Sequence, residues 1–273
     1  MRIKIIDKQK CDKCTQRTCS INNTVSKSDF YNLKTEQYTC PMKIFVYGLT
    51  DEQMEKGYVD FNLANNECLY CCLCAIQCSQ ENLKIENYEY DARADFLRLK
   101  ECGQRQAEGP SNIIALSYLN IIFEFAANTN LIKPLSFDGA FFNNKNEPCM
   151  VEVDINNDSL ECCRRLLADI TLHNHKNENK VYNGLMVLND FPKDGSRDVY
   201  TLLQKIYEYE KTAGLKIYIT TFSLLRYLAI NHRKDDDKSF NIFYNPSLES
   251  KDKYLDRLAE TGIITTEMKD MIF

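Results

Sequence analysis

The sequence predicts a two-domain protein that mixes helices and strands, of the α+β or α/β class, because its composition and patterning change sharply along the chain. Most of the 13 cysteines crowd into the first third, whereas the remainder alternates between helix-like and strand-like runs. The stretch between them, residues 91–110, is rich in charge and ends in Gly109-Pro110, a pair typical of a loop. We therefore expect one domain over residues 1–90, a linker over 91–110 and a second domain over 111–273.

Length and composition favour folded domains with ordinary cores, since the chain has 273 residues of which 44% are hydrophobic. The first ten residues alternate charged side chains with isoleucine, and no apolar run approaches the length of a membrane span, so we expect a cytoplasmic protein without membrane contact. Cysteines crowded into one segment without an export signal favour metal or cluster ligation over disulfides. The net charge of -5 gives no general basic field, so a nucleic-acid partner would need a local basic patch.

The spacing of four cysteines in the first domain is typical of a cluster-binding loop. They are separated by two, two and three residues: Cys68, Cys71, Cys74 and Cys78. Two residues between ligands turn the chain tightly enough to place successive sulfurs on neighbouring corners of one cubane, and soft thiolates suit iron. Zinc remains an alternative, although it usually takes two pairs of ligands separated by a longer loop.

This first third resembles the two-cluster ferredoxin family, in which a short strand precedes each set of cysteines. Here Arg2–Ile6 leads into Cys11, and Gly57–Phe61 leads into Cys68. The resemblance implies a ferredoxin-like domain holding two 4Fe-4S clusters. By position in the family, the first cluster would take Cys11, Cys14, Cys19 and Cys78, and the second would take Cys40, Cys68, Cys71 and Cys74.

The chain departs from that family at several positions. Four residues separate Cys14 from Cys19, and twenty more follow before Cys40. Ser79 follows the last cysteine of the second set where the family usually has proline, and Cys72 stands where ferredoxins commonly have glycine. The remaining five cysteines are expected to be small buried hydrophobes: Cys72, Cys102, Cys149, Cys162 and Cys163.

The second domain is predicted to be a mixed sheet flanked by helices. Ser111 can cap a helix whose apolar residues recur at helical spacing, and two strand-like runs follow it. The expected elements after that helix are strands at 135–142 and 149–155 joined by a turn at 143–146, a helix capped at Asp158 or Ser159, a strand at 181–188, a helix at 198–213 closed by Gly214, a strand at 215–221 and two further helices.

Acidic residues lie at matching places on this predicted hairpin. Asp138 stands in the first strand within Phe137-Asp138-Gly139, and the second strand reads Val151-Glu152-Val153-Asp154. Two carboxylates on adjacent strands can share one octahedral Mg²⁺, a hard cation that prefers oxygen ligands. With Glu124 on the preceding helix, these acids make residues 111–273 resemble the PD-(D/E)xK nuclease superfamily, which includes many restriction endonucleases.

That resemblance implies a restriction-endonuclease-like mixed-sheet domain that hydrolyses a phosphodiester. In it, Asp138 and Glu152 would bind Mg²⁺, and Glu124 and Asp154 would complete the catalytic set. Asp154 stands where the family usually has the lysine that orients the attacking water. Asp154 could bind a second metal instead, or Lys133 or Lys145 could supply the positive charge from elsewhere.

Three functions remain open from the sequence. The first is an iron–sulfur-containing, Mg²⁺-dependent DNA endonuclease or nuclease subunit. The resemblance to restriction endonucleases implies a role for it in restriction or defence. The second is a ferredoxin-type electron-transfer or redox-sensing module docked to a protein partner, and the third is a nuclease-fold binding protein without catalysis. Arg164 and Arg165 could contact phosphates, although such residues more often form a solvated face. The choice between DNA and RNA and the oligomeric state are not determined by the sequence.

Overall fold

The chain separates into two compact units. A computed structural model describes residues 2–7, 9–10, 71–78, 80–86, 110–123, 138–143, 145, 147–154, 158–178, 180–193, 197–231 and 239–271. One unit comprises Met1–Glu89 with Glu101–Ile114, and the other comprises Tyr90–Lys100 with Ala115–Phe273. The predicted linker 91–110 lies outside the described residues except for its last residue, so its boundaries stay a prediction.

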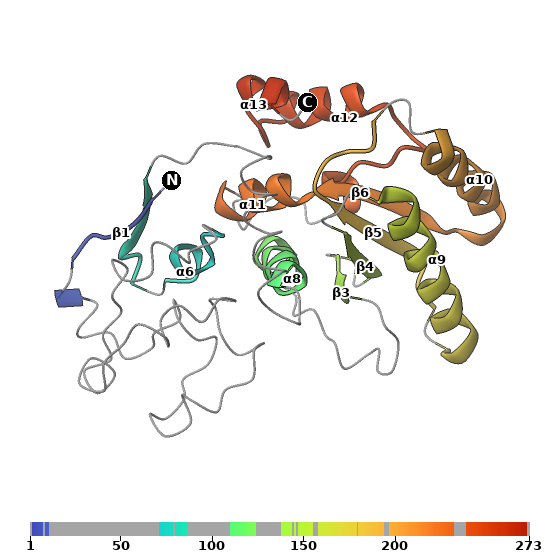
Figure 1. Cartoon of the computed structure of the whole chain (residues 1–273), viewed down its shortest axis with the longest axis horizontal. Helices are drawn as coiled ribbons and strands as arrows, with labels where there is room; N and C mark the ends of the chain where they lie inside the picture. Colours follow the sequence, from blue (N-terminus) through green and yellow to red (C-terminus); the bar gives the residue numbers. More distant parts are fainter. Residues whose placement is uncertain are drawn as a thin grey trace. The chain divides into compact units, whose positions relative to one another are not determined.

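The first unit contains a small antiparallel ladder and a one-turn helix (Figure 1). Strand β1, Arg2–Ile5, confirms the strand expected before the first cysteine set and pairs with β2, Leu83–Glu86. Helix α6, Leu73–Ile76, carries part of the second cysteine set. The strand expected at Gly57–Phe61 lies outside the described residues.

The second unit contains a four-stranded mixed sheet, as the sequence predicts. Its strands run in the order β3-β4-β5-β6, with bounds β3 Gly139–Phe142, β4 Pro148–Asp154, β5 Asn183–Leu188 and β6 Lys216–Thr221. Strands β3 and β4 form the predicted antiparallel hairpin, whereas β4, β5 and β6 are parallel. Parallel neighbours require crossover connections, and helices supply both of them.

Helices α9, Ser159–Lys176, and α10, Arg197–Ala213, make these two crossovers and contact each other (Figure 1). The predicted cap of α9 is confirmed, because the Oδ1 atom of Asp158 accepts a hydrogen bond from the backbone N–H of Glu161 at 3.0 Å. Gly214 has φ 75° just beyond the end of α10, the left-handed conformation that closes many helices. Local signals therefore fix the ends of the crossover helices.

Helix α9 approaches the sheet closely because β5 presents a glycine to it. A Cβ atom built on Gly184 would lie 2.9 Å from side-chain atoms of Leu166, Ile170 and Ile217. Only a residue without a Cβ admits these side chains at that distance. The depth and rotation of α9 over β4 and β5 therefore depend on Gly184, and they decide which α9 side chains reach the acids of β4.

Aromatic side chains pack the opposite face of the sheet. Helix α8, Pro110–Phe123, ends in Phe123, whose ring centroid lies 4.7 Å from that of Phe141 on β3. Phe141 in turn meets Phe240 at 5.6 Å, edge to face. These rings are buried, and pairs of this kind add stability beyond the area they bury.

The C-terminal part contains three helices among the described residues, whereas the sequence predicts two. They are α11 Phe222–Asn231, α12 Lys251–Glu260 and α13 Thr266–Met271, with the 3-10 turn η3 Phe240–Ile242 between the first two. The chain after η3 returns to the sheet, where Tyr244 forms an antiparallel bridge with Ile219 of β6. Helix α13 has only six residues, too few for a periodic pattern to reveal it.

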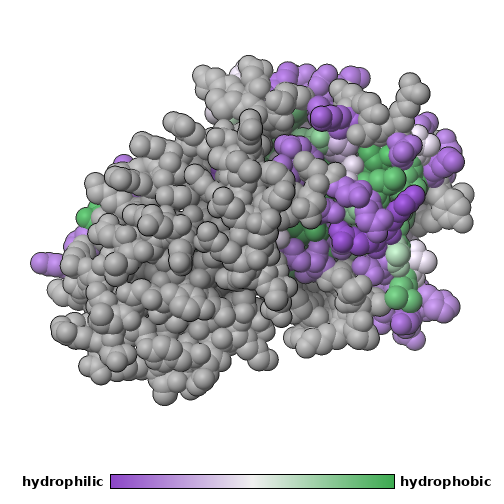
Figure 2. All heavy atoms as spheres, viewed as in Figure 1, coloured by the Kyte–Doolittle hydropathy of each residue, from purple (hydrophilic) through white to green (hydrophobic). Residues whose placement is uncertain are grey.

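The described surface is largely hydrophilic, with smaller hydrophobic areas, in the view of Figure 2. Four large hydrophobic side chains are exposed among the described residues: Ile6, Leu172, Tyr182 and Leu248. None of the described helices combines the length and the apolar character that crossing a membrane requires.

Candidate functional site

The β3–β4 hairpin brings the two predicted metal ligands together. Gly139 pairs with Val151, so continuing this register by one residue places Asp138 opposite Glu152. The Oδ2 atom of Asp138 accepts a hydrogen bond of 2.7 Å from the backbone N–H of Val153, which anchors its carboxylate against β4. The two acids also interact electrostatically, because the negative charge of Asp138 helps to raise the pKa of Glu152.

Glu152 and Asp154 point to the face of β4 that α9 covers. Alternate residues of a strand share a face, and both of these side chains are buried, with 4% and 8% of their surface exposed. Arg165 of α9 bridges them: its Nε lies 2.8 Å from Oε1 of Glu152 and its Nη2 lies 3.2 Å from Oδ2 of Asp154. The Arg165 side chain is 45% exposed, so the guanidinium forms the solvent-facing side of a buried acidic pair.

Negative charge exceeds positive charge in this cluster, which we define as Asp138, Glu152, Asp154, Arg165 and Asp169. Burial, followed by the charge of Asp138, raises the pKa of Glu152 to about 8, although Arg165 opposes this shift. Burial also raises the pKa of Asp138 and of Asp169, both against the attraction of Arg165. Desolvation lowers the pKa of Arg165, but its acidic neighbours raise it more, so the guanidinium stays charged. The cluster defined in this way holds one basic group and four carboxyl groups.

One oxygen of this cluster lacks a partner. The Oε2 atom of Glu152 is buried and has no hydrogen-bond partner among the described residues. Leaving a buried acceptor unsatisfied costs about 1–3 kcal/mol, so such atoms are uncommon in folded proteins. An acceptor in this state, beside a second carboxylate, is suited to a cation.

The donor set fits Mg²⁺ by its chemistry. Mg²⁺ binds hard oxygens, keeps several waters and often takes only one or two protein carboxylates, which Asp138 and Glu152 can provide. Within the described part of the chain, no group of three or more His, Cys, Asp or Glu side chains is gathered as a metal site. Glu124, the predicted additional acid, lies outside the described residues.

The positive charge beside the acids comes from Arg165, which the sequence suggested as a phosphate contact but not as the partner of Glu152 and Asp154. Lys145 is exposed in the β3–β4 turn, at the opposite end of the hairpin from Glu152. Four residues of strand, about 14 Å at the usual rise, separate Pro148 at that turn from Glu152. Lys133 lies outside the described residues. The sequence signal for its pairing with the acids was its place on a helix that follows the acidic strand directly.

Three buried cysteines lie on β4 and α9, and they lack the reactivity of a metal ligand. Cys149, Cys162 and Cys163 are fully buried, as predicted, and none is in a disulfide. The Sγ atom of Cys162 lies 3.7 Å from the backbone oxygen of Glu152, to which it donates a weak hydrogen bond. Burial raises the pKa of all three thiols, so they remain protonated and pack as small hydrophobes. Cys102 lies outside the described residues.

The cysteine loop of the first unit is described only around α6. Cys74 is buried, and Cys71 and Cys78 are half-buried on either side of it. Cys72 is buried at the start of α6 with φ 63°, a left-handed conformation that favours glycine. This conformation agrees with the glycine that the resembled family commonly has there. The other predicted cluster ligands lie outside the described residues: Cys11, Cys14, Cys19, Cys40 and Cys68.

Asn82 fastens the end of β1 to the cysteine loop. Its side-chain Oδ1 accepts a hydrogen bond from the backbone N–H of Asp7 at 2.9 Å, and its Nδ2 donates to the Asp7 carbonyl at 2.6 Å. Its own backbone N–H donates to Sγ of Cys78 at 3.3 Å. Hydrogen bonds to a cysteine sulfur stabilise its anionic form and tune a cluster that it binds. The chain therefore leaves Asp7 toward Cys11 from a point tied to the residues around Cys78.

No protein-family model, curated protein or solved structure matches this chain. The geometry by itself defines the class: a protein with a mixed α and β architecture, whose four-stranded mixed sheet carries a cluster of buried acids and one arginine at the end of a hairpin.

Proposed function

We propose that this chain is a Mg²⁺-dependent nuclease of the PD-(D/E)xK type that cleaves DNA, joined to a ferredoxin-like domain with two 4Fe-4S clusters. One observation carries the proposal: Asp138 and Glu152 lie opposite each other at the end of the β3–β4 hairpin, and the buried Oε2 atom of Glu152 has no partner in the described residues. An acidic pair with a spare buried acceptor is suited to a divalent cation, and phosphodiester hydrolysis is chemistry that such a cation supports.

The residues around the acids have distinct tasks in this proposal. Asp138 and Glu152 would hold Mg²⁺, which when bound lowers the pKa of its water and neutralises charge on the phosphate. The backbone N–H of Val153 orients the Asp138 carboxylate toward the pair. Arg165 supplies the positive charge that the lysine of the resembled family would bring from position 154. Its guanidinium comes from α9 rather than from β4.

The cysteine loop would have a structural role. Hydrolysis of a phosphodiester transfers no electron, so clusters in such an enzyme serve to hold the chain or to position it on a partner. The predicted ligand Cys74 lies in α6, two others, Cys71 and Cys78, flank it, and the N–H of Asn82 reaches the sulfur of Cys78. The left-handed Cys72 between two predicted ligands lets the loop turn tightly enough for neighbouring thiolates to face one cubane.

The test uses the full chain purified without oxygen. Iron and acid-labile sulfide are measured first, and nicking of supercoiled plasmid is then followed with and without Mg²⁺. Wild-type protein should nick only with Mg²⁺, and Glu152→Gln should remove the activity. Glu161→Gln is the matched control, because this exposed acid on α9 has no contact with the cluster. Nicking that survives Glu152→Gln would contradict the proposed site.

A second function is favoured by a specific observation. Asp154 replaces the usual lysine, and Arg165 already forms ion pairs with both acids of β4. A nuclease fold in that state could bind nucleic acid without cutting it. Tight DNA binding that is insensitive to Mg²⁺, together with no nicking by wild-type protein, would select this alternative.

A further inference from the structure

The position of Arg165 raises a problem for any cation that enters the acidic cluster. Its Nε already lies 2.8 Å from Oε1 of Glu152. One of the two oxygens of the carboxylate that should bind Mg²⁺ is therefore already paired with the Arg165 guanidinium. A guanidinium and a divalent ion at the same carboxylate repel each other strongly, because little water separates them in a buried site.

We propose that Arg165 is a built-in counter-cation that competes with the divalent cation for Glu152 and, once displaced, binds a backbone phosphate of the nucleic acid. This inference rests on the proposed function, since it assigns a regulatory and substrate-binding task to a residue of that same site. It makes metal binding the event that exposes a phosphate-binding group.

The geometry allows such an exchange by side-chain rotation alone. The backbone of α9 is fixed, because the neighbouring Leu166 and Ile170 pack against Gly184 at close range. The Arg165 side chain, in contrast, is 45% exposed and borders solvent. It reaches Glu152 at 2.8 Å and Asp154 at 3.2 Å from the solvent side of these buried acids, so the guanidinium can leave Glu152 without disturbing the core.

The charges of the cluster favour replacement of the Arg165 guanidinium by a divalent ion at Glu152. Without a divalent ion, the guanidinium is the only cation that contacts Glu152 among the described residues, and it leaves Oε2 of that residue without a partner. A divalent ion supplies two charges and can use Oε2, which the guanidinium does not reach. Arginine then finds a suitable partner in phosphate, whose oxygens match its planar set of donors.

The first test measures cation binding without any catalysis. Mn²⁺ is titrated into the full chain and its free concentration is followed by electron paramagnetic resonance. Removing a competing charge should tighten Mn²⁺ binding about tenfold, within the usual range of coupling between two ligands. Arg165→Ala should show this effect, and Arg165→Gln should show it too while keeping some hydrogen bonding. Arg164→Ala, an exposed neighbour outside the cluster, should change the affinity by less than about twofold because its charge is screened by solvent.

The second test measures the coupling to nucleic acid. Ca²⁺ replaces Mg²⁺ so that binding can be followed without cutting, and the anisotropy of a labelled DNA duplex reports affinity. The divalent ion should tighten DNA binding of wild-type protein, and Arg165→Ala should lose most of this gain, while Lys205→Ala, the loss of an exposed charge on α10, keeps it.

The outcomes separate the two proposals. Mn²⁺ binding that depends on Glu152 but is unchanged or weaker in both Arg165 variants overturns the exchange and leaves the metal site standing. Mn²⁺ binding that is the same in Glu152→Gln and wild-type protein overturns the metal site and the exchange with it. Circular dichroism and melting curves establish that each variant is folded.

Discussion

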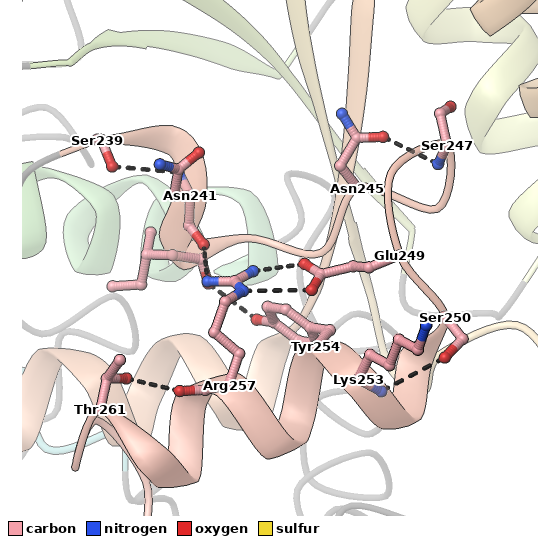
Figure 3. Close-up of polar contacts among 11 residues, drawn as sticks. Ser239, Asn241, Asn245, Ser247, Glu249, Ser250, Lys253, Tyr254, Arg257 and Thr261 are labelled. Carbon is pink, nitrogen blue, oxygen red and sulfur yellow. Dashed lines mark hydrogen bonds and ion pairs between the residues drawn. The ribbon is translucent and has the colours of Figure 1, made fainter.

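In the part of the chain that the structure describes, Arg257 and Arg165 both pair with carboxylates, and they do so in opposite ways. Arg257 of α12 binds both oxygens of Glu249, through Nε at 3.2 Å and Nη2 at 2.5 Å, and donates to the carbonyl of Asn241 at 2.7 Å (Figure 3). Its guanidinium also lies 5.4 Å from the centre of the Tyr254 ring. Arg165, in contrast, touches one oxygen each of two acids and leaves a buried oxygen of Glu152 without a partner.

The difference separates a structural contact from a candidate functional one. Around Arg257, one base pairs with one acid. Each nitrogen of its guanidinium donates a hydrogen bond, and these bonds hold the segment between η3 and α12 against α12. Tyr254 adds a hydrogen bond from its hydroxyl to the carbonyl of Ile242 at 2.9 Å. Arg165 contacts two buried acids, and its charge also lowers the pKa of two more, Asp138 and Asp169, against the effect of burial. Networks that are fully satisfied stabilise a fold, whereas partial satisfaction in a buried site is a sign of function or of a missing ligand.

The largest expected effect lies in activity. Glu152→Gln removes a predicted metal ligand, so Mg²⁺-dependent plasmid nicking should fall by about a thousandfold, the scale on which loss of one electrostatic stabiliser slows a reaction. Glu249→Gln, the equivalent change at the satisfied arginine, should leave nicking near the wild-type rate. Equal losses in both variants would show that the contrast between the two sites has no functional meaning.

The next largest effect is expected from the hydrogen bonds between the Asn82 side chain and the backbone of Asp7 in the first unit. Asn82→Ala removes both side-chain hydrogen bonds to Asp7 and leaves two backbone groups without partners, so we expect a loss of about 2–3 kcal/mol in stability and less iron bound per chain. Gln80→Ala, in an exposed position of the same loop, is the control. Unchanged iron content in Asn82→Ala would separate this network from cluster binding.

The stability should depend on pH through Glu152. Its pKa is about 8 in the folded protein against an ordinary value of 4.5, so the folded state holds a proton that the unfolded chain releases. The free energy of unfolding should therefore decrease as pH rises from about 5 to about 8, by up to about 1.4 kcal/mol per pH unit from this group. Urea unfolding across that window should show a smaller slope in Glu152→Gln. An identical slope in both proteins would mean that Glu152 titrates normally.

The smallest effect is expected at the satisfied arginine. Arg257→Ala breaks a bidentate pair that is partly exposed, so the loss in unfolding free energy should be about 1–2 kcal/mol. Lys253→Ala, an exposed change on the same helix, should have a much smaller effect. A loss at Arg257 no larger than the loss at Lys253 would show that the clamp of Figure 3 contributes little.

Much of the second unit followed from local signals. The cap at Asp158, the closing Gly214 and the turn around Asn143 were readable because each depends on neighbours in the sequence. In that turn the Oδ1 atom of Asn143 accepts from the N–H groups of Lys145 and Glu147. The hairpin register then places Asp138 opposite Glu152 without help from any distant residue.

The sequence by itself determined the order of strands and crossover helices along the chain, the start of α9, the end of α10 and the pairing of two acids across a hairpin, because short-range hydrogen bonds and side-chain periodicity decide these features. Tertiary structure alone decided that Arg165 meets Glu152 and Asp154, and that Asn82 meets Asp7 across 75 positions of sequence. The reason is physical: how far α9 sinks and turns over the sheet depends on close packing at Gly184, a contact that no local pattern encodes.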